Sequence, residues 1–136
     1  MSQIIAAVST GNVVSAIGII RMTGAGCAEV ADRVFTRRNG RSLAEAPERK
    51  LVLGDLHDSQ GRVIDQCCAI YTPGPNSFTG EDTVDFHCLG SPAVLADKAE
   101  CRRILREENV AIMPAYMMMH FLNSQGDPLE FLEGAK

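Results

Sequence analysis

The apolar residues of this chain fall into short runs, each about the length of a strand and each followed closely by Gly, Pro or Asn. The first two runs, residues 4–8 and 13–22, are rich in Ile and Val and lie on either side of a turn at Thr10-Gly11-Asn12. β-Branched residues favour extended backbone, and turn residues between two such runs indicate that the chain reverses direction. The sequence therefore predicts a protein in which strands outnumber helices.

The middle of the chain carries a second pair of strand-like runs. Residues 50–57 and 63–72 flank the polar stretch Asp58-Ser-Gln-Gly61, which predicts a β-hairpin. The stretch from Pro73 to Ser77 contains two prolines and a glycine, so it must be a turn, because proline cannot donate to the hydrogen-bond ladder of a sheet.

Residues 78–89 resume strand character with a two-residue period. The two predicted faces carry Val84, Phe86 and Cys88 on one side and Thr83, Asp85 and His87 on the other. The apolar set is expected to face the core. A last strand is predicted over residues 109–113.

Two longer segments have helical features. Apolar residues recur at three- and four-residue spacing from Cys27 to Phe35, which predicts a helix within residues 26–37. Ser91 is a good N-cap and Pro92 suits the first helical position, so a second helix is predicted over residues 91–108. A short helix is expected over residues 117–122.

These elements predict an α+β fold, with a mixed or antiparallel sheet covered by two main helices. The length of 136 residues fits one domain, spanning residues 1–136. The Met-rich stretch at residues 117–119 is expected to be packing material or a self-association surface.

The amino-acid composition limits the kinds of partner that this chain can bind. Thirteen Lys and Arg against 17 Asp and Glu give a net charge of −4, so strong direct binding of nucleic acid is not expected. No apolar run is long enough for a membrane span, and the N-terminus lacks the pattern of a signal peptide. A cytoplasmic protein is expected, in which the five cysteines are free thiols.

The sequence contains no motif for stand-alone catalysis. It has neither a phosphate-binding loop with lysine nor a Gly-x-Ser-x-Gly nucleophile elbow. His87 and Cys88 are adjacent on a predicted strand and would point to opposite faces, so they cannot chelate one metal together. We therefore expect no catalytic residue and no metal site.

Arg21 and Asp85 are the charged residues whose positions need explanation. Arg21 closes the apolar run Ile17-Gly-Ile-Ile20, and Asp85 lies mid-strand between apolar residues. A charged group at the end of a buried strand needs solvent or an acidic partner. A direct contact between the two, or a shared polar ligand, is one arrangement. The pattern alone favours the other, a surface arginine and an outward-facing aspartate.

Three stretches resemble a known family. They are Pro73-Gly-Pro-Asn-Ser-Phe-Thr-Gly-Glu-Asp-Thr-Val-Asp-Phe-His-Cys-Leu-Gly-Ser-Pro-Ala-Val-Leu95, Ile17-Gly-Ile-Ile-Arg-Met-Thr-Gly24 and Phe121-Leu-Asn123. They resemble motifs of the N-terminal domain of the MnmE (TrmE) tRNA-modification GTPases, in the order found in that family. The resemblance covers nearly the whole chain and is strongest over residues 73–95.

The resemblance implies a fold similar to the folate-binding unit of the glycine cleavage T-protein. It also implies a homodimer that binds a tetrahydrofolate derivative, either 5-formyl- or 5,10-methylene-tetrahydrofolate. The expected partner is an MnmG-like flavoprotein, which acts with the family on the wobble uridine of tRNA, or a separate GTPase. Arg21 matches the folate-contacting arginine of the family. Asp85 stands where the family has a folate-contacting glutamate, and Gln125 falls near its lysine.

Several positions depart from the family pattern. Residues 11–16 replace a Pro- and Gly-rich turn, Leu89-Gly-Ser-Pro92 replaces His-Gly-Gly-Pro, and Pro114-Ala-Tyr-Met117 replaces Pro-Gly-Glu-Phe. The acid at Asp85 is one methylene shorter than glutamate. The 136 residues contain no GTPase motif, so we expect no GTP hydrolysis by this chain. The chain is either a piece of a longer protein or a free-standing, diverged relative of the family, and the departures near its end favour the second.

Two functions remain open from the sequence. One is a tetrahydrofolate-binding module that serves tRNA wobble-uridine modification. The other is a dimerisation or partner-docking domain whose folate site has been lost and which has no catalytic activity.

Overall fold

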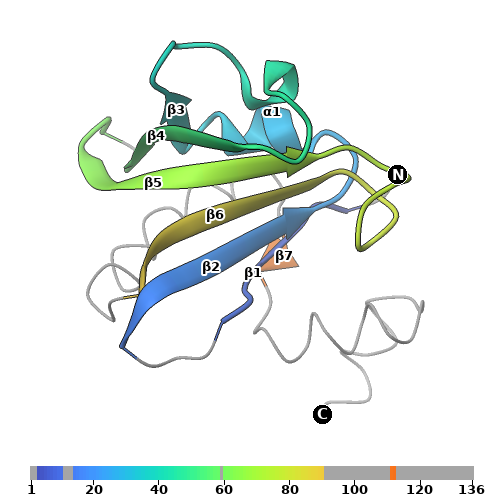
Figure 1. The fold of residues 1–136 in the computed structure, drawn as a ribbon, viewed down its shortest axis with the longest axis horizontal. Helices are drawn as coiled ribbons and strands as arrows, with labels where there is room; N and C mark the ends of the chain where they lie inside the picture. The colour runs from blue at the N-terminus through green and yellow to red at the C-terminus, as the bar shows by residue number, and fades with distance from the viewer. Residues whose placement is uncertain (1–2, 11–13, 59, 91–110, 113–136) are drawn as a thin grey trace.

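The computed structural model describes residues 3–10, 14–58, 60–90 and 111–112. These residues form a seven-stranded sheet with one short α-helix and one 3-10 turn (Figure 1). In chain order the elements are β1 (Ile5–Val8), β2 (Ser15–Thr23), α1 (Cys27–Ala31), β3 (Phe35–Arg37), η1 (Leu43–Glu45), β4 (Leu51–His57), β5 (Val63–Thr72), β6 (Thr83–Gly90) and β7 (Ala111–Ile112). No helix within these ranges is long and apolar enough to cross a membrane.

The strands lie in the order β3-β4-β5-β6-β2-β1-β7. Neighbouring strands are antiparallel except for β1 and β7, which run parallel. The sheet is therefore mixed, one of the two forms predicted from the sequence, and β7 lies within the last predicted strand. Because β2 is hydrogen-bonded to β6, the start of the chain lies beside a strand that follows α1, β3, β4 and β5 in the sequence.

The β4–β5 hairpin forms where the sequence predicts it. Asp58 closes its turn: Oδ1 accepts hydrogen bonds from the backbone N–H groups of Gln60 and Arg62, each at 2.9 Å, and Oδ2 accepts one from Arg62 Nε at 2.7 Å. Burial of the Asp58 carboxyl opposes ionisation, but the hydrogen bonds from Arg62 and Gln60 outweigh it and lower the pKa of Asp58.

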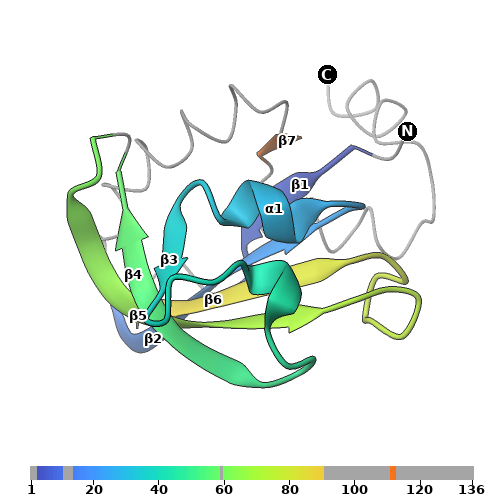
Figure 2. The same cartoon turned by 90° about the horizontal axis from the view of Figure 1, so that it is seen from above.

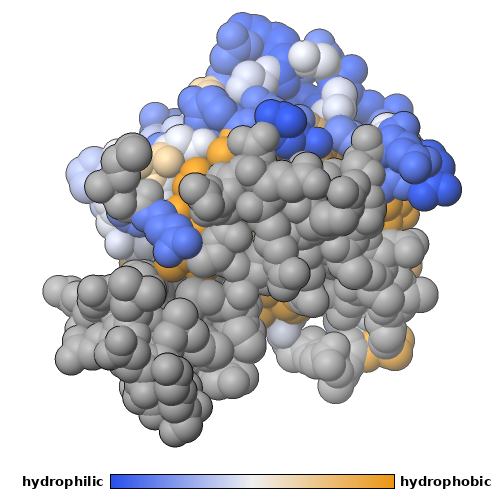
Figure 3. All heavy atoms as spheres, turned by 180° about the vertical axis from the view of Figure 1, so that it is seen from behind, coloured by the Kyte–Doolittle hydropathy of each residue, from blue (hydrophilic) through white to orange (hydrophobic). Residues whose placement is uncertain are grey.

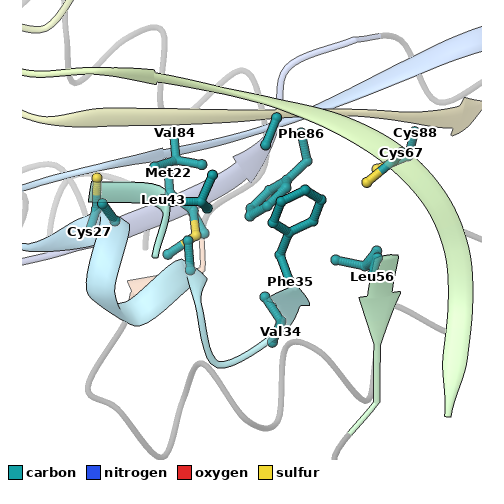
Figure 4. Close-up of a cluster of buried hydrophobic side chains, with 14 residues drawn as sticks. Met22, Cys27, Val34, Phe35, Leu43, Leu56, Cys67, Val84, Phe86 and Cys88 are labelled. Carbon is teal, nitrogen blue, oxygen red and sulfur yellow. The ribbon is translucent and has the colours of Figure 1, made fainter. Parts of the chain in front are cut away.

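One face of the sheet packs against α1 and η1 to form the core (Figure 2). The side chains predicted to face inward from β6, those of Val84, Phe86 and Cys88, are at most 3% exposed. The Phe86 ring lies tilted against the ring of Phe35, with centroids 5.5 Å apart (Figure 4). Such an aromatic pair contributes about 0.5–1.5 kcal/mol beyond its burial.

The first helix is shorter than predicted. α1 ends at Ala31, so the prediction of a main helix within residues 26–37 is wrong. The chain leaves the helix at Asp32, whose carboxylate accepts hydrogen bonds from Ser42 Oγ at 2.5 Å and from the Leu43 N–H at 2.9 Å. These bonds tie the end of α1 to η1 and turn the chain toward the sheet.

Strand β3 follows directly and was not predicted. Phe35, which the sequence placed on the helix, pairs with Leu56 of β4, and its side chain is buried. Gly54 permits this packing, because a Cβ at that position would overlap the Phe35 ring and lie only 2.5 Å from the carbonyl oxygen of Thr36. The helical spacing of apolar residues therefore marked burial and did not require one continuous helix.

Other differences from the predicted elements concern the start of β6 and the segments that follow it. β6 begins at Thr83, not at Phe78, because the residues between them belong to a loop. The helices predicted over residues 91–108 and 117–122 lie outside the described residues. The described part of the fold is thus a sheet with one five-residue helix and a 3-10 turn, not a sheet covered by two main helices.

The variant Gly54→Ala tests the packing of β3 on β4. The added Cβ has no space between a ring and a backbone carbonyl, so we expect the free energy of unfolding to fall by about 1–3 kcal/mol, the range for an overpacked core. Urea unfolding measures this change. Leu53→Ala, at the half-exposed neighbouring position, is the matched control and should cost less. An unchanged urea midpoint for Gly54→Ala would contradict the packing.

Candidate ligand site on the open face of the sheet

The open face of the sheet, which we define as the face opposite α1, carries Arg21 and Asp85. The two residues are directly opposite each other in the β2–β6 register. Their neighbours Met22 and Val84 lie in the core, so the alternation of side chains along a strand directs Arg21 and Asp85 to the other face. Arg21 donates from Nε to Asp85 Oδ1 at 2.8 Å and from Nη2 to Asp85 Oδ2 at 2.7 Å.

This bidentate ion pair is partly buried. The side chain of Arg21 is 25% exposed and that of Asp85 is 16% exposed. The hydrogen bond to Asp85 raises the pKa of Arg21 against the opposing effect of burial, so the guanidinium stays charged. The sequence pattern favoured a surface arginine and an outward-facing aspartate. Asp85 does face outward, but both side chains are partly buried and they bind each other. The alternative, a direct contact between the two, is confirmed.

Phe78 lies over the same ion pair. The Cζ atom of Arg21 is 5.4 Å from the centre of the Phe78 ring, which is the geometry of a cation–π contact. Phe78 is nevertheless 69% exposed. The strand predicted over residues 78–89 included Phe78 with no functional role. An aromatic residue directly after a rigid double-proline turn was nevertheless a usable signal for a site. The structure adds it to the site as an exposed flat ring beside a fixed charge.

Asp82 anchors the loop that carries Phe78. Its Oδ1 accepts a hydrogen bond from the Gly74 N–H at 2.9 Å, and its Oδ2 accepts one from the Gly26 N–H at 3.4 Å. Its backbone carbonyl accepts from the Gly24 N–H at 2.9 Å and from Thr23 Oγ1 at 3.2 Å. One aspartate therefore ties both ends of the loop to the end of β2 and the start of α1.

Hydroxyl groups complete the support of this loop. Thr79 Oγ1 lies 2.6 Å from Thr23 Oγ1 and 3.3 Å from Thr83 Oγ1. On the other side, Arg49 donates from Nη2 to the Asn76 carbonyl at 2.7 Å. The loop is therefore held from β2, from β6 and from the segment before β4, which sets the position of the Phe78 ring over Arg21.

The described cysteines are free thiols. Cys67 is buried and Cys68 is half-buried, so one residue of this adjacent pair faces the core. Cys67 is hydrogen-bonded to Cys88, and this bond and the burial of Cys67 raise the pKa of its thiol. Burial likewise raises the pKa of Cys27 to about 12. These thiols therefore stay protonated at neutral pH and are poor nucleophiles.

Of the three residues that the resemblance assigned to a folate site, the structure brings two together. Arg21 and Asp85 are in contact, and Gln125 lies outside the described residues. Within the described part of the chain, no group of three or more His, Cys, Asp or Glu side chains is placed to hold a metal ion. The arrangement offers a planar cation, a carboxylate and an exposed aromatic ring, which suits a flat ligand that carries hydrogen-bond donors and negative charge.

The model of one protein family, described as the GTP-binding protein TrmE N-terminus, matches residues 4–115. Similar proteins carry the name tRNA modification GTPase MnmE. The relative from Chlorobium phaeovibrioides is 42% identical over 95 residues, covering 68% of this chain and 20% of its own length. The relative from Synechococcus sp. is 30% identical over 130 residues, covering 93% of this chain and 28% of its own length. The chain thus spans between a fifth and a third of the length of these relatives.

A double-mutant cycle on Arg21→Gln and Asp85→Asn measures the strength of the ion pair. We expect a coupling of about 1–2 kcal/mol in the free energy of unfolding, between the values of an exposed ion pair and of a buried charged hydrogen bond. The same cycle on Arg41 and Glu45, an ion pair whose side chains are 65% and 53% exposed, is the control and should give less than about 0.5 kcal/mol. Equal coupling in the two cycles would contradict the geometry.

Proposed function

The chain belongs to the TrmE N-terminal family, and from that premise we propose that it is a tetrahydrofolate-binding module of a tRNA wobble-uridine modification system. The observation that carries the proposal is the placement of Arg21, Asp85 and Phe78 side by side on the open face of the sheet. Two of these residues match the folate contacts implied by the family motifs. When bound, a tetrahydrofolate derivative supplies a one-carbon unit.

The chemistry of the three side chains fits such a ligand. The edge of a pterin ring carries adjacent N–H donors, and one carboxylate can accept a hydrogen bond from each of them, one on each oxygen. The glutamate tail of a folate carries carboxylates, which the fork of an arginine can bind in a bidentate manner. The exposed face of Phe78 can stack on a flat ring of the ligand. Asp85, Arg21 and Phe78 are the residues that would hold the cofactor.

The ion pair also sets a limit on affinity. Both carboxylate oxygens of Asp85 already accept hydrogen bonds from Arg21, so a ligand must replace at least part of this pairing. Asp85 also reaches one methylene less far than the glutamate of the family pattern. We therefore expect affinity in the micromolar range or weaker.

Calorimetric titration with 5-formyltetrahydrofolate tests the proposal. Arg21→Ala should weaken binding by about 10- to 100-fold, because a charge-assisted hydrogen bond contributes about 1.5–3 kcal/mol and a decade of affinity costs about 1.4 kcal/mol. Asp85→Glu should tighten binding by restoring the lost reach. Arg41→Ala, far from the ion pair in the sequence and on an exposed segment, should leave affinity unchanged. No binding by the parent protein, or binding that Arg21→Ala leaves intact, would refute the folate site.

The second candidate function is self-association through the open face. Exposed apolar side chains cross this face on β2, β4 and β6, among them Ile17 (56% exposed), Leu53 (45%) and Leu89 (52%). A band of exposed apolar side chains on one face commonly marks an interaction surface. A second copy of the chain can cover it symmetrically, which makes a two-fold homodimer the simplest occupant. We propose an MnmG-like flavoprotein or a separate GTPase as the partner, and a cytoplasmic location.

Sedimentation equilibrium tests this second function. The parent protein should be a dimer, and Ile17→Lys combined with Leu53→Lys should shift it to monomer, because two charges would be buried in the interface. Val63→Lys, at an exposed apolar position next to the β4–β5 turn, is the matched control and should leave the dimer intact. A parent protein that stays monomeric over a wide concentration range would exclude the homodimer.

A further inference from the structure

The segment from residue 33 to residue 41 concentrates positive charge. It contains Arg33, Arg37, Arg38 and Arg41 and no acidic residue. The rest of the chain contains the other nine basic residues and all 17 acidic residues, so its net charge is −8. The acidic total therefore conceals a strongly basic segment.

The fold places this segment at one edge of the sheet. β3 is the edge strand, and the chain after it turns back through Gly40, which has a φ of 70° and donates from its N–H to the Arg37 carbonyl at 2.9 Å. Seen from behind, hydrophilic side chains gather over the upper end of the molecule, where Figure 1 places β3 and the start of the following segment (Figure 3). This end is separate from the Arg21–Asp85 pair, which lies on the central strands β2 and β6.

A groove opens beside the edge strand. Its volume is about 220 Å³. The residues that line it are Arg37, Arg38, Asn39, Val52 and Leu53. A water molecule occupies about 30 Å³ in the liquid, so the groove has room for a phosphate group and part of the sugar attached to it. The lining combines two guanidinium groups with an amide and two apolar side chains, which suits a charged group attached to a less polar one.

The contacts of the arginines leave their charge available to a ligand. Arg38 approaches Asp55 only to 3.9 Å, and its side chain is 57% exposed. Arg37 donates from Nη1 to the Ser42 carbonyl at 3.0 Å, a bond that orients the guanidinium without neutralising it. Exposed ion pairs contribute about 0–1 kcal/mol, so a phosphate can displace the contact of Arg38 with Asp55. Guanidinium forks match phosphate oxygens in a bidentate manner.

We propose that this groove binds the phosphodiester backbone of an RNA. The inference rests on the proposed role in tRNA modification, which makes an RNA the polyanion that this family would meet. Binding is independent of sequence, weak and sensitive to salt, because backbone contacts are electrostatic and the acidic remainder of the chain repels the same ligand. The expectation that strong nucleic-acid binding is absent is compatible with weak binding at this one edge.

Fluorescence anisotropy of a labelled, unmodified tRNA transcript tests the groove with the full chain at several salt concentrations. The parent protein should bind, and the double variant Arg37→Gln/Arg38→Gln should bind more weakly. The slope of log affinity against log salt should become shallower by about 1.4–1.8, since each lost phosphate contact removes about 0.7–0.9. Arg37→Lys/Arg38→Lys keeps the charge and should retain most of the slope. Circular dichroism verifies that each variant is folded.

The control double variant Lys50→Gln/Arg62→Gln removes the same charge outside the groove, at two exposed positions, and should change the slope little. Equal weakening by the two double variants would mean that net charge alone binds RNA, and would overturn the groove. Displacement of the tRNA by polyglutamate at equal charge would assign the groove to an acidic protein and would also overturn the proposal. Folate titration of Arg37→Gln/Arg38→Gln separates the two hypotheses, because folate affinity should equal that of the parent protein whether or not RNA binds.

Discussion

The pairing of β2 with β6 is the contact on which the rest of the structure depends. It joins the strand at the start of the chain to the hairpin strands of the middle, and its register sets Met22 beside Val84 in the core and Arg21 beside Asp85 on the open face. A slip of one residue would send the ion pair into the core and the apolar side chains to the surface. The core and the candidate site therefore specify the same register, each from its own face of the sheet.

The loop from Pro73 to Asp82 connects that register to the candidate site. The carboxylate and carbonyl of Asp82 bind backbone groups on both sides of the loop, and the Thr23–Thr79 contact holds its tip to β2. As a result, Phe78 stays exposed yet keeps a defined place over Arg21. A preorganised ring of this kind reduces the ordering cost that a ligand would otherwise meet on binding.

The sequence predicted local features well and non-local ones poorly. The β4–β5 hairpin and the inward face of β6 followed from turn residues and a two-residue period, which depend on neighbours in the chain. The predicted helix within residues 26–37 was wrong, because Phe35 lies in β3 and packs against Gly54 of β4. The periodicity of the sequence does not reveal this contact. The contact of Arg21 with Asp85 was likewise hidden, since it joins residues 64 positions apart. The family motifs pointed to both residues, but only the register shows that they bind each other.

A nuclear magnetic resonance titration with 5-formyltetrahydrofolate tests the central claim most directly. The Nε–Hε signal of Arg21 reports on the hydrogen bond to Asp85, and a ligand that replaces this bond must move the signal. We expect this signal and the amide signals of Phe78 and Asp85 to shift together with one affinity, while the amide signals of β3 stay in place. Shifts confined to other parts of the sheet, or an Arg21 signal that stays fixed while the ligand binds, would contradict a folate site at this ion pair.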